Sequence, residues 1–436
     1  MKLTPILVGA FTLALAASAS AQTITIATVN NGDMIRMQGL SSAFTEATGI
    51  ELNWVVLEEN TLRQNVTTDI ATNGGQYDVM TIGTYEAPIW AKQGWLAPLD
   101  GLAADADYDI NDLLPPIRDG LSVDGKLYAA PFYGESSFIM YRTDLMEKAG
   151  LTMPEAPTWE FIGEAARAMT DRANDINGIC LRGKAGWGEN MAFLTAMSNS
   201  FGARWFDENW VPQFDQPEWK NTLDTYLALM ADAGPSGASS NGFNENLTLF
   251  QQGKCGMWID ATVAASFVTN ANDSTVADKV GFALAPDTGL GKRGNWLWAW
   301  SLAIPNSSQN KEAAEQFINW ATNKEYLATV AAAEGWANVP PGTRISLYEN
   351  PEYQAAAPFA EMTMGSIYAA DPTHPTVDPV PYVGVQFVAI PEFAGIATNV
   401  GQLFSAALAG QMSADDALAQ AQDATLRDMT RAGYIK

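Results

Sequence analysis

Short apolar runs alternate with amphipathic segments along the first part of the chain. Runs rich in β-branched residues at 23–29, 51–57 and 77–82 predict three strands. Between them, apolar residues recur every three or four positions over 34–48 and 62–73, and each stretch ends at glycine, which predicts two helices. This order is typical of a parallel sheet with right-handed crossovers, in which ligands bind beyond the carboxyl ends of the strands.

The remainder of the chain alternates less regularly but mixes the same two kinds of element. The further elements expected are strands at 126–133, 255–260, 280–285 and 298–304, and helices at 311–322 and from Ser413 onward. Ser413 and Asp416 stand in a capping-box arrangement at the start of the last helix. The pattern predicts an α/β fold from one end of the chain to the other.

Three apparent functional motifs are not supported by the residues around them. The segment Gly289–Gly294 matches a dinucleotide-binding pattern, but a strand follows it instead of a helix, so its glycines predict a hairpin. The acidic turn that begins at Asp105 lacks the glycine and glutamate of a calcium loop. The single histidine, His374, has no neighbouring acid and serine elbow, so a hydrolase triad is not supported.

Composition narrows the chemistry further. The 436 residues include 49 acidic and 24 basic side chains, for a net charge of −25, which argues against nucleic acid or anionic lipid as the main partner. With one His and two Cys, neither a histidine-based metal cluster nor a zinc ribbon is expected, and no cofactor is predicted. Binding must come from carboxylates, amides, hydroxyls and aromatic rings.

The N-terminal residues predict export. Lys2 precedes the apolar stretch Ile6–Ala17, and Ala19-Ser-Ala21 fits the small-residue cleavage pattern, so residues 1–21 are expected to be a signal peptide removed after Ala21. A membrane anchor is the alternative, but the apolar stretch is short for one. We therefore expect a periplasmic protein. In that compartment Cys180 and Cys255 can form a disulfide, with two buried free thiols as the alternative.

Aromatic and carboxylate side chains gather at the expected ends of strands. Such a combination suits carbohydrate-like ligands, whose C–H faces pack on aromatic rings and whose hydroxyls need hydrogen-bond acceptors. For each tryptophan, simple core packing is the competing interpretation. The candidate ligand-binding residues are Asn31, Asp33, Glu58, Tyr85, Glu86, Tyr133, Glu135, Trp187, Glu189, Asn190, Asp260, Trp298, Trp300 and Trp336.

A tryptophan-rich strand and one glutamate stand out by their sequence context. Trp296, Trp298 and Trp300 alternate along one expected strand, so their rings should share one face of it. Glu135 follows the apolar residues Ala-Ala-Pro-Phe-Tyr-Gly, where a carboxylate without a role would carry a desolvation cost.

Several longer motifs resemble a known family. They are Asp124-Gly-Lys-Leu-Tyr-Ala-Ala-Pro-Phe-Tyr-Gly-Glu135, Met140-Tyr-Arg-Thr-Asp-Leu145, Pro157-Thr-Trp-Glu160, Phe250-Gln-Gln-Gly-Lys-Cys-Gly-Met-Trp258 and Trp300-Ser-Leu-Ala-Ile-Pro305. In this order they resemble the family-1 extracellular solute-binding proteins of ABC importers, the maltose-binding-protein-like receptors. The run Val55-Val-Leu-Glu-Glu-Asn60 and the segment Gly335–Pro341 resemble the polyol receptors of the sorbitol/mannitol type within that family.

The resemblance implies a two-lobe periplasmic-binding-protein fold, each lobe a mixed sheet flanked by helices, with a hinge between the lobes. Residues 22–133 and 302–350 would form lobe I, and residues 134–301 and 351–436 lobe II. It further implies a monomer that captures a neutral polyol or monosaccharide and delivers it to the membrane subunits of an ABC importer. By position it assigns ligand contacts to Asn31, Asp33, Tyr85, Glu86, Glu135, Glu189, Asn190, Asp260 and Trp300.

Two other functions stay open at this point. A secreted glycoside hydrolase would need two carboxylates flanking one glycosidic bond at defined separations, which a sequence does not reveal. A receptor for amines or oligosaccharides is suggested by the acidic charge. The resemblance favours a receptor without catalytic activity.

Overall fold

The computed structural model describes residues 22–435, so the predicted signal peptide and its cleavage point lie outside the described residues. Within that range no helix is long and apolar enough to cross a membrane. The strands are β1 (Thr23–Val29), β2 (Glu51–Leu57), β3 (Val79–Gly83), β4 (Ser122–Val123), β5 (Lys126–Leu127), β6 (Ala130–Glu135), β7 (Ser137–Arg142), β8 (Asn177–Cys180), β9 (Cys255–Ala261), β10 (Val280–Leu284) and β11 (Trp298–Ala303).

Five strands form the larger sheet, in the order β2-β1-β3-β11-β6. β1 pairs in parallel with β2, from Thr23 opposite Glu51 to Val29 opposite Leu57, and in parallel with β3. The parallel pairing predicted for the first three strands is therefore confirmed. β11 lies between β3 and β6 and runs antiparallel to both. Because β3, β11 and β6 are buried along their whole length, the centre of this sheet is core.

Four strands form the smaller sheet, in the order β10-β7-β9-β8. β7 runs antiparallel to both β10 and β9, whereas β8 is parallel to β9. Both sheets are therefore mixed, as the sequence resemblance implied. The carboxyl end of β9 leads into the same region of the molecule as the carboxyl end of β6, because Thr262 donates its N–H to the carbonyl of Ser136 at 2.8 Å.

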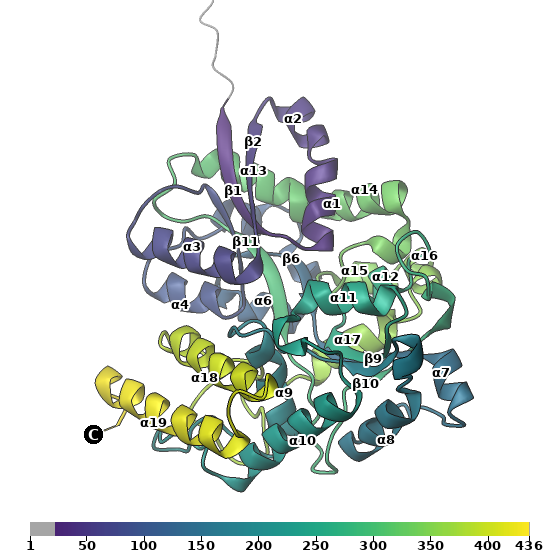
Figure 1. Cartoon of the computed structure of the whole chain (residues 1–436). Helices are drawn as coiled ribbons and strands as arrows, with labels where there is room; N and C mark the ends of the chain where they lie inside the picture. The colour runs from purple at the N-terminus through teal and green to yellow at the C-terminus, as the bar shows by residue number, and fades with distance from the viewer. Residues whose placement is uncertain (1–21, 436) are drawn as a thin grey trace, which may run out of the picture.

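Helices cover both sheets. Figure 1 shows the larger sheet with α1, α3 and α13 in the upper part of the view, and the smaller sheet with α8, α10 and the yellow C-terminal pair α18 and α19 in the lower part. The helices that precede β6 are α1 (Gly32–Leu40), α2 (Ser42–Thr48), α3 (Glu59–Ala71), α4 (Glu86–Lys92), α5 (Asp100–Ala104) and α6 (Pro115–Gly120). Those that follow are α7 (Thr143–Lys148), α8 (Trp159–Met169), α9 (Asn190–Ser200), α10 (Pro217–Ala233), α11 (Phe243–Gln251), α12 (Ala264–Val268), α13 (Lys311–Thr322), α14 (Lys324–Glu334), α15 (Ile345–Glu349), α16 (Pro351–Ala356), α17 (Ala360–Ala369), α18 (Phe393–Leu408) and α19 (Ala414–Ala432).

The predicted cap of the last helix is present, since the Ser413 hydroxyl accepts the N–H of Asp416 at 3.1 Å. Two expected elements are divided. The predicted helix 34–48 is broken at Ser41 into α1 and α2. The predicted strand 126–133 becomes β5, which forms a hairpin with β4 through Asp124 and Gly125 at positive φ, and β6, which joins the larger sheet. An Asp-Gly pair favours such a tight turn.

Between its strands, the chain passes from one sheet to the other at two described places, and later helices that follow β11 return to the smaller sheet. A single residue, Ser136, separates β6 in the larger sheet from β7 in the smaller one. The return occurs between β10 and β11, so these two strands lie in different sheets. The hairpin predicted at Gly289–Gly294 is therefore wrong, because the segment connects two sheets instead of two paired strands. The predicted lobe boundaries, 133/134 and 301/302, both fall inside strands of the larger sheet, and the lobe assignment stays a prediction.

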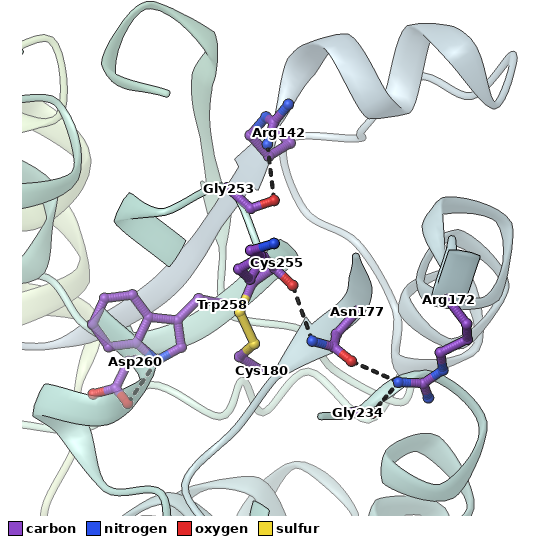
Figure 2. The surroundings of a disulfide bond; sticks show 10 residues. Arg142, Arg172, Asn177, Cys180, Gly234, Gly253, Cys255, Trp258 and Asp260 are labelled. Atoms are coloured by element: carbon purple, nitrogen blue, oxygen red, sulfur yellow. Dashed lines mark hydrogen bonds between the residues drawn. A yellow bond between two sulfur atoms is a disulfide. The ribbon is translucent and has the colours of Figure 1, made fainter. Parts of the chain in front are cut away.

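Cys180 and Cys255 form a disulfide, with their Cα atoms 5.9 Å apart. They lie on the neighbouring parallel strands β8 and β9. Figure 2 shows Asn177 beside the bridge, where its side chain accepts a hydrogen bond from Arg172 at 2.6 Å and donates one to the carbonyl of Lys254 at 3.1 Å. The predicted bridge is confirmed, and the alternative of two free thiols is excluded.

Candidate functional site

Two adjoining cavities lie between the sheets. The first, here the main cavity, has about 500 Å³ of empty volume, partly open to solvent, and the second, the side cavity, about 340 Å³. Glu59, Glu135, Arg182 and Trp300 line both, so the two are continuous parts of one cleft.

Both sheets contribute to the cleft. From the larger sheet, Asn31 follows β1, Glu58 follows β2, and Tyr133, Glu135 and Trp300 lie on β6 and β11. Lining residues that belong to the smaller sheet and its connections are Arg182, Lys184, Glu189, Phe243, Asn244, Glu245, Ala261 and Val263. The carboxyl ends of β1 and β2 meet at this cleft, as expected for the parallel strands with which the larger sheet begins.

Helix caps hold the first two strand-end residues in place. The Asn31 side-chain oxygen accepts the N–H of Met34 at the start of α1, and Glu58 accepts the N–H of Thr61 at the start of α3, both at 3.2 Å. Asn31 also donates to the Tyr133 hydroxyl at 2.7 Å. The same side chains therefore cap helices and line the cavity, which fixes their orientation before any ligand is bound.

Eight of the predicted residues line one or both cavities. They are Asn31, Glu58, Tyr133, Glu135, Trp187, Glu189, Trp298 and Trp300. Trp298 and Trp300 share a face of β11 with their ring centroids 5.5 Å apart, whereas Trp296 precedes the strand. The expected alternation of three tryptophans on one strand is therefore wrong for Trp296, which nevertheless lines the side cavity.

Three predicted residues lie directly behind the cavity wall. Asp260 accepts hydrogen bonds from Arg182, the shortest at 2.6 Å from a terminal guanidinium nitrogen. Glu86 accepts one from Arg63 at 2.7 Å. Tyr85 packs on Trp187 with ring centroids 4.8 Å apart and donates its hydroxyl hydrogen to the carbonyl of Ile390 at 3.0 Å. Their side chains orient lining residues and line neither cavity themselves.

The remaining three lie elsewhere. Asn190, buried at the start of α9, donates to the carbonyl of Gly401 at 2.8 Å. Asp33 pairs with Arg36 at 2.5 Å, and burial raises the pKa of Asp33 to about 6. Trp336 is half-buried in a short 3₁₀ turn and lines neither cavity.

Sequence reasoning missed two buried arginines. Arg182 donates to both oxygens of Asp260 and, at 2.9 Å, to the carbonyl of Gly188. Burial alone would lower the pKa of Arg182, but the Asp260, Glu189 and Glu59 carboxylates together raise it above its usual value. Arg63, on α3, lies against the faces of three tryptophans. In the sequence each arginine is an isolated basic residue, so no motif marked either one.

Burial shifts the pKa values of two carboxyl groups in the cleft. It raises the pKa of Glu135 well above its usual value, with Arg182 acting in the opposite direction. Burial and the nearby Glu59 carboxylate together raise the pKa of Glu189 to about 8, against the lowering effect of Arg182 and Lys184. One oxygen of Glu189 is buried without a hydrogen-bond partner. Protonated carboxyl groups can both donate and accept hydrogen bonds, which matches hydroxyl-rich ligands.

Three direct contacts join the two sides across the mouth of the cleft. Lys184 donates to Glu58 at 2.6 Å, Asn60 donates to the carbonyl of Ala185 at 3.1 Å, and Asn244 donates to the carbonyl of Asn30 at 2.9 Å. We call these the mouth contacts. Among residues 22–435, no group of three or more His, Cys, Asp or Glu side chains is arranged to hold a metal ion. The cleft is built for hydrogen bonding and aromatic contact.

Comparison with known proteins identifies the family. Residues 31–328 match the family of bacterial extracellular solute-binding proteins. The chain belongs to that family. Over 417 residues, 95% of each chain, this solute-binding protein is 59% identical to a mannitol-binding protein of Pseudomonas aeruginosa.

Solved structures agree. An ABC transporter solute-binding protein of Agrobacterium vitis with bound D-mannitol shares 73% identity and a TM-score of 0.95, covering 95% of this chain and 100% of its own. A solute-binding protein of Agrobacterium radiobacter in complex with ribitol shares 25% identity and a TM-score of 0.83, covering 93% and 98%. The expected two-lobe fold and the expected class, a receptor of an ABC importer and not an enzyme, are confirmed for this solute-binding protein.

Proposed function

We propose that this protein is the periplasmic receptor of an ABC importer, which captures a polyol of the mannitol type in the cleft between its sheets and delivers it to the membrane subunits. The observation that carries the proposal is the likeness, at 73% identity over 95% of the chain, to a receptor with D-mannitol bound. The relative of Pseudomonas aeruginosa that is 59% identical is likewise named for mannitol.

The chemistry of the cleft supports a polyol. A hexitol offers six hydroxyl groups, each a donor and an acceptor, along a chain whose C–H groups can pack on an aromatic ring. Trp300 supplies such a ring, and Glu135 and Arg182 supply an acceptor and a donor at the point where the two cavities meet. We infer that these three side chains contact the ligand, with Asn31 and Glu189 at its other end.

The proposed function also implies where the protein acts and in what assembly state. We infer that residues 1–21 are a signal peptide cleaved after Ala21 and that the mature chain acts as a monomer in the periplasm. The disulfide between Cys180 and Cys255 supports an oxidising compartment, because such bridges are rare in the cytosol.

Isothermal titration of the mature protein, unfolded and refolded to remove bound ligand, tests the proposal. The ligands are mannitol, sorbitol, ribitol, glucose, maltose and putrescine. Mannitol should bind with the highest affinity, and maltose and putrescine should give no heat at millimolar concentration. Tight binding of putrescine or maltose, with no response to any polyol, would contradict the proposal.

Glu135→Gln checks the assignment of the site. The amide keeps the shape of the side chain but changes its hydrogen-bonding pattern, so mannitol affinity should fall by about tenfold or more, the equivalent of one buried hydrogen bond to a charged or protonated carboxyl. The matched control is Glu46→Gln on the exposed surface of α2, which should bind as the unmodified protein does. Equal affinity for both variants would remove Glu135 from the ligand contacts.

A further inference from the structure

Arg63 occupies an aromatic cage at the inner end of the cleft. Its guanidinium carbon lies 4.0 Å from the ring centroid of Trp187, 4.6 Å from that of Trp300 and 5.0 Å from that of Trp298. All three distances fall within the range of attractive cation–π contacts. The side chain is only 9% exposed, so the guanidinium is largely removed from water.

Two carboxylates complete the cage. Glu59, one turn earlier on α3, accepts hydrogen bonds from Arg63 at 3.0 and 2.9 Å, and Glu86 accepts one at 2.7 Å. Aromatic faces combined with carboxylates are the chemistry by which proteins bind ammonium and guanidinium ligands. The cage is therefore a cation site whose cation belongs to the chain itself.

The cage opens onto the cleft. Arg63 lines the side cavity together with Trp187, Trp298 and Trp300. Glu59 and Trp300 also line the main cavity, so a ligand there and the Arg63 guanidinium share two wall residues. A ligand with a positive end would reach a cage that is already filled.

We propose that Arg63 is a specificity-determining residue, an internal cation that fills the aromatic cage and restricts the cleft to neutral ligands. The proposal rests on the proposed function, since it assumes that ligands bind in this cleft. It also explains how an acidic receptor avoids amines. Without Arg63, Glu59 and Glu86 would lose the cation that is hydrogen-bonded to both of them beside the tryptophan rings, and a ligand ammonium would supply one.

The first experiment tests the cage alone. Arg63→Ala leaves a hole of guanidinium shape, and methylguanidinium at millimolar concentration should fill it. The melting temperature of the variant should rise in a saturable way with methylguanidinium, while that of the unmodified protein stays constant. Arg431→Ala on the exposed face of α19 is the matched control and should show no rise. The absence of a saturable rise in Arg63→Ala would overturn the proposal, whichever sugar or polyol the protein binds.

The second experiment tests selectivity with Arg63→Met, which keeps the bulk of the side chain without its charge. Mannitol is compared with 1-amino-1-deoxymannitol, which carries an ammonium at one end, by titration calorimetry. The unmodified protein should prefer mannitol by at least about tenfold, and Arg63→Met should shift the ratio toward the amine by about tenfold or more. Arg63→Lys, which restores a cation, should recover the preference for mannitol.

The outcomes separate the two proposals. If the unmodified protein binds no polyol, the proposed function fails, while the methylguanidinium result still decides whether the cage is a cation site. If the unmodified protein binds mannitol but Arg63→Met keeps the original selectivity ratio, Arg63 is a packing residue and the specificity proposal is wrong. If Arg63→Lys behaves as Arg63→Met does, charge is not the determinant, and the proposal is wrong for that reason.

Discussion

At the scale of single residues, the cleft is defined by charges that are buried in pairs. Arg182 is held by Asp260 and Arg63 by Glu59 and Glu86, so each guanidinium keeps its place without a ligand. Glu189 differs, because one of its oxygens is buried with no hydrogen-bond partner, although it lies 3.5 Å from the Arg182 guanidinium. A carboxyl group in that situation favours its protonated form.

The raised pKa of Glu189, about 8 against an ordinary 4.5, makes stability depend on pH. Between pH 4.5 and about 8, the Glu189 carboxyl group stays protonated in the folded protein but is ionised in the unfolded chain. The stabilisation is therefore complete below the ordinary pKa and is lost as the pH rises through about 8. We expect the melting temperature of the ligand-free protein to fall by several degrees between those limits. Glu189→Gln should flatten the decline, as measured by thermal unfolding at a series of pH values.

The matching control for that series is Glu46→Gln, which removes an exposed carboxylate from α2. Its profile should follow that of the unmodified protein. A decline of equal steepness in Glu189→Gln would assign the pH dependence to another group, with Glu135 the next to test because burial raises its pKa as well.

At the scale of elements, the disulfide joins β8 to β9 across a chain separation of 75 residues. The two strands are parallel neighbours in the smaller sheet, and β8 is an edge strand with one partner. The disulfide therefore adds a covalent link to an edge strand that is hydrogen-bonded to the sheet on one side only. Arg182 lies two positions beyond Cys180, just after the end of β8, so the bridge also anchors the segment that carries this cleft residue.

Replacing both cysteines with alanine should lower the free energy of unfolding by about 4 kcal/mol, the chain-entropy value for a loop of this length. Denaturant titration measures the change. The variant should be insensitive to dithiothreitol, while the unmodified protein should approach the stability of the variant when reduced. Equal stability of the two proteins under oxidising conditions would mean that the bridge does not restrain the unfolded chain.

Local sequence patterns predicted most of the helices and strands. The features that were predicted wrongly or missed depend on contacts between distant segments. β2 and α13 have the bounds that the apolar periodicity predicted, because each is decided by residues within one segment. The connection between β10 and β11 looked like a hairpin, since its glycines are visible in sequence while the identity of the pairing strands is not. Arg63 and Arg182 were missed for the same reason, because the tryptophans around Arg63 and the Asp260 partner of Arg182 come from distant segments.

At the scale of the whole molecule, the mouth contacts connect the two sides of the cleft directly, and most of their residues also line the main cavity. Opening the cleft must break them, so they favour the closed arrangement. The contact between Lys184 and Glu58, at 2.6 Å, is partly exposed, with side-chain exposures of 27% and 43%. Exposed ion pairs contribute only about 0.2–1 kcal/mol and weaken in salt.

Lys184→Met should therefore weaken mannitol binding by no more than about fivefold, the equivalent of that contribution. The affinity of the unmodified protein should fall modestly between low and high salt, and the variant should lose most of this dependence. Titration calorimetry at two salt concentrations measures both effects. Lys220→Met, which removes a surface ion pair between α10 and the start of α19, is the control and should leave affinity unchanged. A loss of binding by orders of magnitude would instead make Lys184 a direct ligand contact.

The position of β11 between β3 and β6 also governs the order in which the chain can fold. During synthesis, β6 is complete at residue 135, but the strand that must lie beside it begins only at residue 298 of 436. Until then β3 and β6 have no shared neighbour, and the larger sheet cannot close. Pairings across so many residues carry a loop-closure cost and form slowly. Closure of the larger sheet therefore waits until β11 has been synthesised, a kinetic delay that follows from the strand order.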